Sequence, residues 1–582
     1  MSGSRLNQTA IAESPVGQSQ TSAASTRPRS DTGTFVLHWV MAIAMILAMI
    51  TGFRISWDGE GAVFSRWIAP ILLQGDIWTI HFIVACIMFA CATAYAVYME
   101  RAALFSRNAL GRMRLLILDA PARLKWQGFN VSLHWGFYLL TLVMMATGIL
   151  LYLGWGGLVV DIHAAVAIAL VAYLVLHILG HFMQGGWAQI FRIFLPKALV
   201  PGPNTKPRPL LAALVIGVAT STAMAALDFG TRDTLAIPKV AKAPILDGVL
   251  DDEAWKALRP ARVHTQQGFN LAGGKGESTV EVRAVHDSET IYFAFRWQDP
   301  TRSIKRMPLV KKADGWHMMN NHGDIADESR YYEDKFAVLF SRSNAFGNGG
   351  TTYMGPKPLA DKPGALNGRG LHYTTDGTYA DMWQWKASRG GHLGKMDDMH
   401  FGPPLTPDKA QIAGTGRYSA GYTNDPGKAF YAQNYKGEPP GGYRGPVGIN
   451  RLPKDYKAMT AKLGTIDMSE TASDDEGSQW WMFDAETVPY TKELDATIPV
   501  GTVMPGILIT GTYEGDRDDV AVVPKWKDGW WTLETRRKLK SASKYDVDFT
   551  EAKPLYMWVS VFDRSQVRHT RHVRPVKLEL RP

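Results

Sequence analysis

The chain has 582 residues, of which 46% are hydrophobic and 20% are charged, and its formal net charge is +9. A chain of this length predicts more than one domain. Its two cysteines, Cys86 and Cys91, lie in one apolar run and in no CxxCH motif, which excludes a disulfide scaffold, a cysteine-rich zinc site and covalently attached c-type haem.

Charged residues are distributed unevenly along the chain. Residues 1–230 contain 15 Lys and Arg and 9 Asp and Glu, whereas residues 231–582 contain 48 and 45. This difference indicates that the first part lies in lipid and the second in water. The excess positive charge of the first part lies in loops that orient it in a membrane, so the net charge gives no reason to expect a nucleic-acid partner.

Five uncharged apolar runs occupy the first part. Each has about the 20 residues needed to cross a hydrocarbon core, so we expect five transmembrane helices surrounded by membrane lipid. The runs are 35–53, 77–99, 131–155, 162–186 and 210–227. Residues 1–34 are rich in Ser, Thr, Gln and Ala and lack an apolar stretch, which predicts a disordered cytoplasmic tail and no signal peptide.

Basic residues predict the orientation of these helices. The tail and the second and fourth loops contain three, six and four Lys or Arg residues, whereas the two opposite loops contain only Arg54 and Arg66. The positive-inside rule therefore places the N-terminus in the cytoplasm of a bacterial inner membrane and everything after residue 228 in the periplasm. The small residues 223–225 resemble a cleavage site, but the run is internal, so we interpret it as an uncleaved anchor.

The first and third runs resemble each other residue by residue. The shared elements, at identical spacing, are Leu37-His38-Trp39 and Thr51-Gly52 in the first and Leu133-His134-Trp135 and Thr147-Gly148 in the third. This repeat predicts a duplicated helical hairpin that forms a four-helix bundle over residues 35–195, with the fifth helix in residues 196–228 as a connector.

Six of the fifteen histidines lie in the predicted helices. An imidazole in lipid is costly to leave without a partner, so each is a candidate functional residue. His163 and His177 are 14 residues apart, about 21 Å and nearly four turns, so they share one helix face at two depths. His81 begins its helix at the outer depth and His38 at the inner depth. Two pairs, His38 with His177 and His81 with His163, predict two b haems, each held by two imidazoles.

His134 and His181 remain outside these pairs. His134 lies at the depth of His38, and His181 lies one turn beyond His177. Either can replace a ligand in the assignment above. They can also line a quinone or proton site on the cytoplasmic side, or form hydrogen bonds within the bundle.

Residues 30–195 resemble the bacterial cytochrome b561 and nickel-hydrogenase b-type cytochrome group, which includes the membrane subunit of formate dehydrogenase. The resemblance rests on His38-Trp39, Thr51-Gly52, His81 and the spacing of His163 and His177. It implies His38 and His177 as ligands of an inner haem b, and His81 and His163 as ligands of an outer one.

Beyond residue 228 hydrophobic residues recur at every second position, as they do in β-strands. Apolar residues alternate in 280–284 and 291–297 around a turn, a hairpin is centred on 526–530, and short strands are expected at 336–340 and 556–562. This pattern predicts a periplasmic antiparallel β-sandwich over residues 229–582, interrupted by a long Gly/Pro-rich loop region from 341 to about 471.

The second part resembles the haem-binding domain of ethylbenzene dehydrogenase-related gamma subunits, in the dimethyl sulfoxide reductase set. The residues that carry this resemblance lie in 246–255, 292–300, 333–340, 381–389 and 562–572. It implies a b haem held by a Met on a core strand and a Lys near the C-terminus. Here Val338 and Leu339 occupy the place of the Met, and the final segment offers His569, His572 and Lys577.

A third haem is therefore a hypothesis for this domain, with two open ligand positions. His569 or His572 is the candidate for one, and the candidates for the other are Met307, His317, Met318, His322 and His372. The alternative is an aromatic-rich ligand site without haem, because such folds also resemble sugar-binding sandwich modules.

Together these observations predict an inner-membrane electron-transfer cytochrome that links the quinone pool to a periplasmic electron carrier or oxidoreductase. No paired carboxylates, Ser/His/Asp set or nucleotide-binding glycine loop stands out, so we expect no substrate chemistry beyond electron transfer. The alternatives are a membrane-anchored sensor that binds a periplasmic ligand, and a quinol-dependent reductase of a small oxidant.

Overall fold

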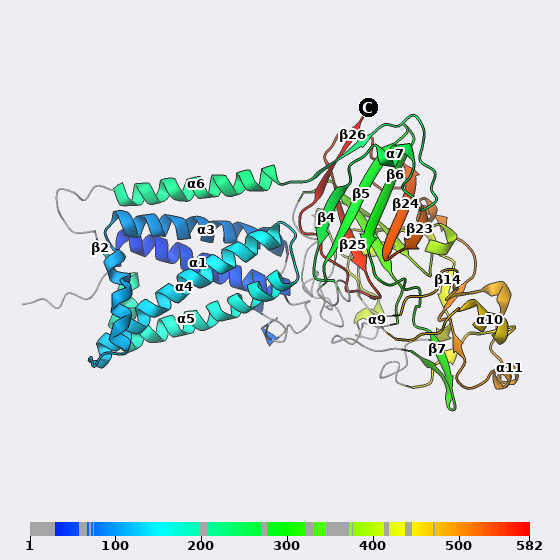
Figure 1. Cartoon of the computed structure of the whole chain (residues 1–582), viewed down its shortest axis with the longest axis horizontal. Helices are drawn as coiled ribbons and strands as arrows, with labels where there is room; N and C mark the ends of the chain where they lie inside the picture. Colours follow the sequence, from blue (N-terminus) through cyan, green and yellow to red (C-terminus); the bar gives the residue numbers. More distant parts are fainter. Residues whose placement is uncertain are drawn as a thin grey trace, which may run out of the picture.

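The computed structural model describes residues 30–56, 64, 67–68, 71–73, 75–197, 208–268, 276–319, 331–344, 372–374, 376–412, 418–436, 445–469 and 472–582. Within these ranges a helical part is followed by a β-rich domain, and the two lie end to end (Figure 1). The predicted fold class, a membrane helical bundle followed by an all-β domain, is confirmed. Most of the predicted tail and His322 lie outside the described residues.

Five helices in the described part are long and apolar enough to cross a membrane. They are α1 (Thr32–Ser56), α3 (Ile77–Arg101), α4 (Ala122–Tyr152), α5 (Leu158–Phe191) and α6 (Arg208–Gly230). α1 packs on α3 and α4 packs on α5, which are the two hairpins that the sequence repeat predicts, and α6 lies along α3 (Figure 1). We call the end of the bundle next to the β-domain the domain-side end, and the opposite end the tail-side end.

The helix ends differ from the predicted runs where charged residues occur. α4 begins at Ala122, nine residues before the predicted start, and includes Arg123 and Lys125. Hydropathy marks only the lipid-embedded part of a helix, whereas the hydrogen-bonded backbone continues into the interface. The backbone of α5 leaves helical geometry at Gly185 and Gly186, where Gly186 has a φ of 61°, and this is the end that the sequence predicts.

Among the described residues, two sheets form the centre of the β-domain. The first sheet has the strand order β12 (Tyr422–Asn424), β11 (Asp397–Phe401), β10 (Ala380–Lys386), β9 (Lys335–Ser341), β25 (Leu555–Phe562), β26 (Val576–Arg581) and β3 (Thr234–Pro238). The second has the order β23 (Ala521–Lys527), β24 (Trp530–Lys538), β6 (Thr290–Gln298), β5 (Ser278–His286) and β4 (Ala261–Thr265). Neighbouring strands are antiparallel except β26 and β3.

The core lies between the two sheets and is rich in aromatic rings. Phe295 and Trp297 of β6 pack on Phe336 of β9, with ring centroids 4.7 Å and 5.0 Å away. These side chains are fully buried, as the alternating pattern of β6 predicts. The hairpin of β23 and β24 turns at Asp528 and Gly529, whose φ values of 51° and 77° are those of a tight hairpin turn.

The prediction of a loop region over residues 341–471 is wrong in part. Its described residues contain β10 and β11, and β10 lies inside the first sheet between β9 and β11. These strands are hard to recognise in the sequence for two reasons. They are short and buried on both faces, so apolar and polar residues do not alternate along them, and glycines and prolines surround them.

Smaller elements surround the sandwich, and β7, α10 and α11 among them lie at its far end, where they form a smaller unit (Figure 1). They are β7 (Leu309–Lys312), β8 (Gly315–Met318), β13 (Gly427–Lys428), β14 (Tyr431–Gln433), β15 (Tyr435–Lys436), β16 (Gly448–Ile449), β17 (Arg451–Pro453), β18 (Met482–Phe483), β19 (Thr487–Pro489), β20 (Val503–Met504), β21 (Ile507–Ile509), β22 (Glu514–Gly515), α7 (Glu253–Lys256), α9 (Lys409–Ile412), α10 (Tyr456–Lys462) and α11 (Lys492–Thr497). At the tail-side end of the bundle, β1 (Ser30–Asp31) pairs with β2 (Pro196–Lys197).

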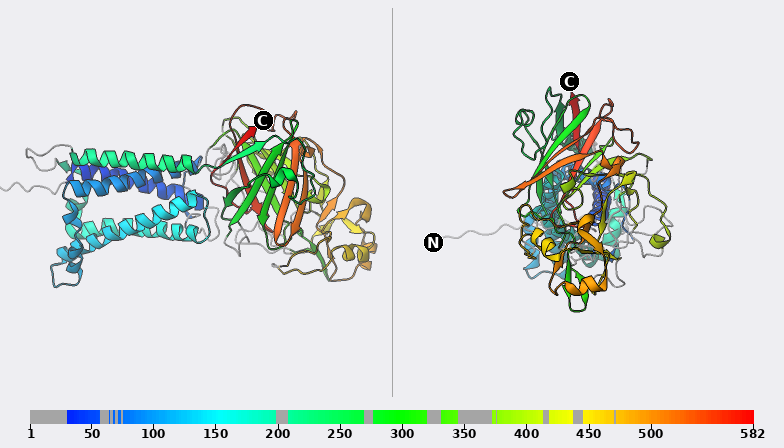
Figure 2. Two further views of the ribbon diagram at one scale, coloured as in Figure 1. Left: turned by 45° about the horizontal axis from the view of Figure 1, so that its top comes forward. Right: turned by 90° about the vertical axis from the view of Figure 1, so that its right-hand side faces the viewer.

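The β-domain contacts the domain-side end of the bundle (Figure 2). The backbone N–H of Gly156, between α4 and α5, donates to the Glu277 carboxylate at 3.0 Å. Trp155 stacks on His264 of β4 with ring centroids 5.2 Å apart. Arg571 donates to the carbonyl of Ile55 near the end of α1 at 3.0 Å. The last segment of the chain therefore lies against the bundle.

Candidate functional site: histidine clusters in the bundle and the β-domain

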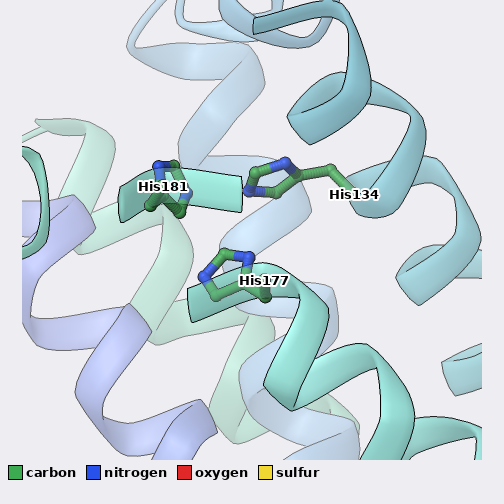
Figure 3. Close-up of side chains that lie close together, drawn as sticks. All are labelled: His134, His177 and His181. Atoms are coloured by element: carbon green, nitrogen blue, oxygen red, sulfur yellow. The ribbon is translucent and has the colours of Figure 1, made fainter. Parts of the chain in front are cut away.

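Histidines from three helices meet near the tail-side end of the bundle. They are His38 of α1, His134 of α4, and His177 and His181 of α5. The rings of His38 and His177 have centroids 6.3 Å apart and an interplanar angle of 28°. His134, His177 and His181 each offer one ring nitrogen, and these three nitrogens all lie within 4.8 Å of one another (Figure 3).

Polar groups of the same helices orient this tail-side cluster. His134 Nδ1 lies 2.5 Å from the carbonyl oxygen of Asn130, one turn earlier. The Asn130 side chain donates to the Gln184 side chain at 2.7 Å and to the Gly180 carbonyl at 3.1 Å. Within the described residues, the buried Nδ1 of His181 has no hydrogen-bond partner. This end of the bundle therefore holds more imidazoles than one metal ion with two axial ligands needs.

The histidines at the domain-side end are held by the repeated threonines. Thr51 Oγ1 lies 2.9 Å from His81 Nδ1, and Thr147 Oγ1 lies 2.8 Å from His163 Nδ1. Each hydroxyl also lies 2.8 Å from a carbonyl of its own helix, four residues earlier, to which it donates. Since a hydroxyl has one proton, it then accepts from Nδ1–H, which leaves Nε2 of each ring with a free lone pair.

The repeated glycines bring these rings close to the preceding helix. A Cβ at Gly52 would lie 3.3 Å from Cε1 of His81, and a Cβ at Gly148 would lie 3.6 Å from Cε1 of His163. The Thr-Gly pairs of the sequence repeat thus form matching cradles for one imidazole each.

These donor sets fit haem b. An axial imidazole uses one ring nitrogen for iron, while its other N–H is fixed by a hydrogen bond that sets tautomer and orientation. His81 and His163 have that arrangement. A metal–imidazole bond is about 2 Å long, so two rings on opposite sides of one ion have centroids roughly 6 Å apart, and His38 and His177 have this spacing.

A second histidine pair lies in the β-domain. The rings of His372 and His569 have centroids 6.2 Å apart at an angle of 39°. His372 stacks on Phe401 of β11 at 4.8 Å, and His569 lies 5.1 Å from the ring of Phe562 of β25. His569 Nδ1 lies 2.8 Å from the carbonyl oxygen of Thr570. Burial, and then the neighbouring Arg571, lowers the pKa of His372 to about 4, and burial and then His372 lowers the pKa of His569 to about 3, so both rings are neutral near pH 7.

The other β-domain residues that the sequence singles out have different surroundings. His572 Nδ1 accepts from the backbone N–H of Val559 at 3.2 Å. His317 pairs with Asp314 at 2.8 Å, and the Met307 sulfur accepts from the Tyr435 hydroxyl at 3.2 Å. Met307 and Met318 belong to an apolar cluster of the smaller unit, apart from His372 and His569. Lys577 is paired with Glu579 at 2.8 Å.

A buried charge network lies elsewhere in the sandwich, and the sequence does not reveal it. Arg537 of β24 is fully buried and donates to Asp381 of β10 at 2.6 Å, and it lies 3.4 Å from Asp546. Asp398 of β11 is also fully buried, and it accepts from the backbone N–H of Met399 at 2.9 Å. Burial, and then the nearby carboxylates of Asp381 and Asp519, raises the pKa of Asp398 well above its usual value.

The fold and the histidines define a membrane b-type cytochrome with a β-domain attached. Residues 29–196 match the family model described as prokaryotic cytochrome b561, and residues 252–574 match the one described as ethylbenzene dehydrogenase. The chain belongs to the ethylbenzene dehydrogenase family, whose model covers more than half of it, and it carries a prokaryotic cytochrome b561 domain before that region. Both predicted family resemblances are confirmed, and so is the membrane, haem and electron-transport character that they imply.

The comparison with curated proteins gives no match. Among solved structures, a carbohydrate-binding module of family 9 from Caldicellulosiruptor kristjanssonii in complex with cellotriose is 8% identical, with 60% of this chain and 93% of that chain covered and a TM-score of 0.21. A putative carbohydrate-binding protein from Bacteroides uniformis is 7% identical, with 60% and 100% covered and a TM-score of 0.22. Likenesses at these TM-scores carry no argument about this chain.

Proposed function

We propose that the protein transfers electrons between the quinone pool and a redox partner that docks on the β-domain. The observation that carries this proposal is the placement of histidines at both ends of one transmembrane bundle. His38 and His177 would hold one haem b at the tail-side end, and His81 and His163 would hold another at the domain-side end. Bound between two imidazoles, each haem supplies reversible one-electron chemistry.

The tail-side cluster supports a quinone site beside the first of these ligand pairs. Interconversion of a quinol and a quinone exchanges two electrons and two protons, so the site needs groups that take up or release protons. His134 and His181 offer ring nitrogens next to His177, and Asn130 and Gln184 add polar groups on the same helices. We assign these two histidines to proton exchange with the quinone.

The orientation is part of the proposal. Basic loop residues favour a cytoplasmic tail-side end, which puts the β-domain in the periplasm of a bacterial inner membrane. The contacts of Arg571 and Gly156 hold the β-domain against the domain-side end of the bundle. A periplasmic electron carrier or oxidoreductase would dock on this domain, and a third haem in it would extend the route.

The decisive experiment is a reduced-minus-oxidised spectrum with a haem-to-protein ratio on the purified full-length protein. At least two haems per chain are expected, and a quinol added to the protein in liposomes should reduce them. His163→Ala should remove one haem, whereas the control His286→Ala, whose ring contacts the carbonyl of Arg581, should remove none. A ratio of zero would refute the cytochrome proposal and leave a ligand-binding module.

A further inference from the structure

We infer that His372 and His569 are the axial ligands of a haem in the β-domain, which therefore binds haem through two imidazoles and not through a Met and a Lys. This inference rests on the proposed function, because it assigns the ligands of the third haem of that electron route. It concerns His372, whose ring stacks on Phe401 of the first sheet, and His569, which lies in the segment that touches the bundle.

The first argument is geometric. The ring centroids of His372 and His569 are 6.2 Å apart at an angle of 39°, against 6.3 Å and 28° for His38 and His177 in the bundle. Two histidine pairs on unrelated folds thus share one spacing, and it is the spacing that an ion between two imidazoles requires.

The second argument concerns the surroundings of the pair. The face of the first sheet that points away from the sandwich core carries a separate apolar cluster, which contains Leu339, Met382, Met399, Phe401, Trp558 and Phe562. His372 stacks on Phe401, and His569 packs beside Phe562, so both rings border this cluster. An apolar face with two imidazoles at its border provides the packing surface and the donors that a non-covalent haem needs.

The third argument concerns the other ligand candidates that the sequence offers. Lys577 is on β26 and paired with Glu579. Of the two residues at the place of the family's Met, Val338 is buried in the sandwich core and Leu339 belongs to the apolar cluster of the outer face, and neither side chain can ligate iron. Met307, Met318 and His317 belong to the smaller unit. His572 uses Nδ1 to accept from the sheet backbone. Among the sequence candidates within the described residues, His372 and His569 are the ones that face each other.

The pair lies close to the contact between the β-domain and the bundle. Arg571, two residues after His569, donates to the carbonyl of Ile55, close to the Thr51-Gly52 cradle of His81. Gln266, which follows β4, exchanges backbone hydrogen bonds with Arg571. The pair therefore lies near the face of the β-domain that meets the bundle, where it links the domain-side histidines to a docked partner.

The test measures haem content and ligation in the purified full-length protein. We expect three haems per chain in the wild type and two in His372→Ala, in His569→Ala and in the double variant, because the two histidines share one haem. The matched control His317→Ala should keep three. His163→Ala combined with His569→Ala should leave one, which separates the β-domain site from the bundle.

A ligand replacement covers the case in which the alanine variants fold poorly. His569→Met should keep three haems. In the electron paramagnetic resonance spectrum, one low-spin signal of bis-histidine type should change to one of histidine–methionine type, and one midpoint potential should rise. Three haems in His569→Ala, or no spectral change in His569→Met, would overturn the assignment. A wild-type ratio of two would overturn it as well and leave the bundle proposal intact, whereas a ratio of zero would refute both.

Discussion

The bundle and the β-domain position their histidines by different means. In the bundle, Thr51 and Thr147 occupy equivalent places in a duplicated hairpin, and each contacts the histidine of the following helix at 2.9 Å and 2.8 Å. In the β-domain, His372 and His569 are distant in sequence and lie outside the strands, and their rings pack on Phe401 of β11 and Phe562 of β25, two strands of one sheet. A site built within helical hairpins can therefore be predicted from the spacing of residues in the sequence, whereas a site built on a sheet from distant segments cannot.

The two ends of the bundle differ in a related way. The domain-side end keeps the symmetry of the repeat, with one Thr-Gly pair for each of His81 and His163. The tail-side end has lost it, because Tyr95 and Met99 of α3 stand where α5 has His177 and His181. The symmetric end has one imidazole from each hairpin, as the proposed domain-side haem needs. The asymmetric end has the additional imidazoles that we assign to proton exchange.

The largest expected effect is the loss of a haem at one end of the bundle. His81→Ala and His177→Ala should each remove one haem, because one axial ligand alone does not hold the group between the helices. Haem-to-protein ratios and redox titration of each variant check this. His134→Ala serves as the control, since it should keep the full haem content and lose activity with quinol. If His134→Ala loses a haem and His177→Ala does not, the tail-side ligand pair is wrong.

The next effect tests the cradles at the domain-side end. Thr51→Val and Thr147→Val keep the shape of the side chain but remove the partner of Nδ1, and loss of such a partner lowers metal affinity roughly 10-fold or more. Haem retention during dialysis against apomyoglobin is the measurement. Thr141→Val is the matched control, because the buried Thr141 hydroxyl has no partner among the described residues. Equal retention in all three variants would show that the threonines do not fix the imidazoles.

The contrast explains how much the sequence could predict. The five membrane helices, the duplicated hairpin and the sandwich are visible in hydropathy, spacing and alternation, and the structure has them. The sequence leaves several partners open for His569, because nothing local distinguishes His372 from His317. β10 falls in the predicted loop region because its buried residues do not alternate and glycines surround it. The contact of Arg571 with Ile55 joins distant segments and has no sequence signal.

A smaller effect separates the β-domain from the bundle by its pH dependence. Because the pKa of Asp398 is raised in the folded state above the unfolded value of 3.8, the folded protein keeps a proton that the unfolded chain releases. Stability is therefore lost as pH rises above about 4 towards the folded-state pKa. Asp398→Asn cannot ionise and retains the oxygen that accepts from Met399. At pH 8 it should be more stable by about 1 kcal/mol or more, since one pKa unit corresponds to about 1.4 kcal/mol.

Thermal unfolding of the β-domain between pH 4 and pH 8, followed by tryptophan fluorescence, measures this difference. The two proteins should unfold at similar temperatures near pH 4, where Asp398 is protonated in both states, and diverge as pH rises. Asp548→Asn is the matched control, because burial of that carboxyl is slight and its pKa is lowered, mainly by its bonds to Thr550. A wild type more stable than Asp398→Asn at pH 8 would mean that Asp398 is ionised and well paired in the folded protein.

The smallest effect distinguishes the two cradles from each other. Alanine in a helix is more favourable than glycine by roughly 0.5–1 kcal/mol, so Gly148→Ala, whose Cβ would lie 3.6 Å from His163, should slightly raise the unfolding temperature. At Gly52 the Cβ would lie 3.3 Å from His81, a tight contact that offsets this gain and displaces the ring. Gly52→Ala should thus shift the domain-side haem spectrum without a gain in stability. Equal shifts in both variants would show that the two cradles are equivalent, because a difference between the variants can come only from how closely each imidazole approaches its helix.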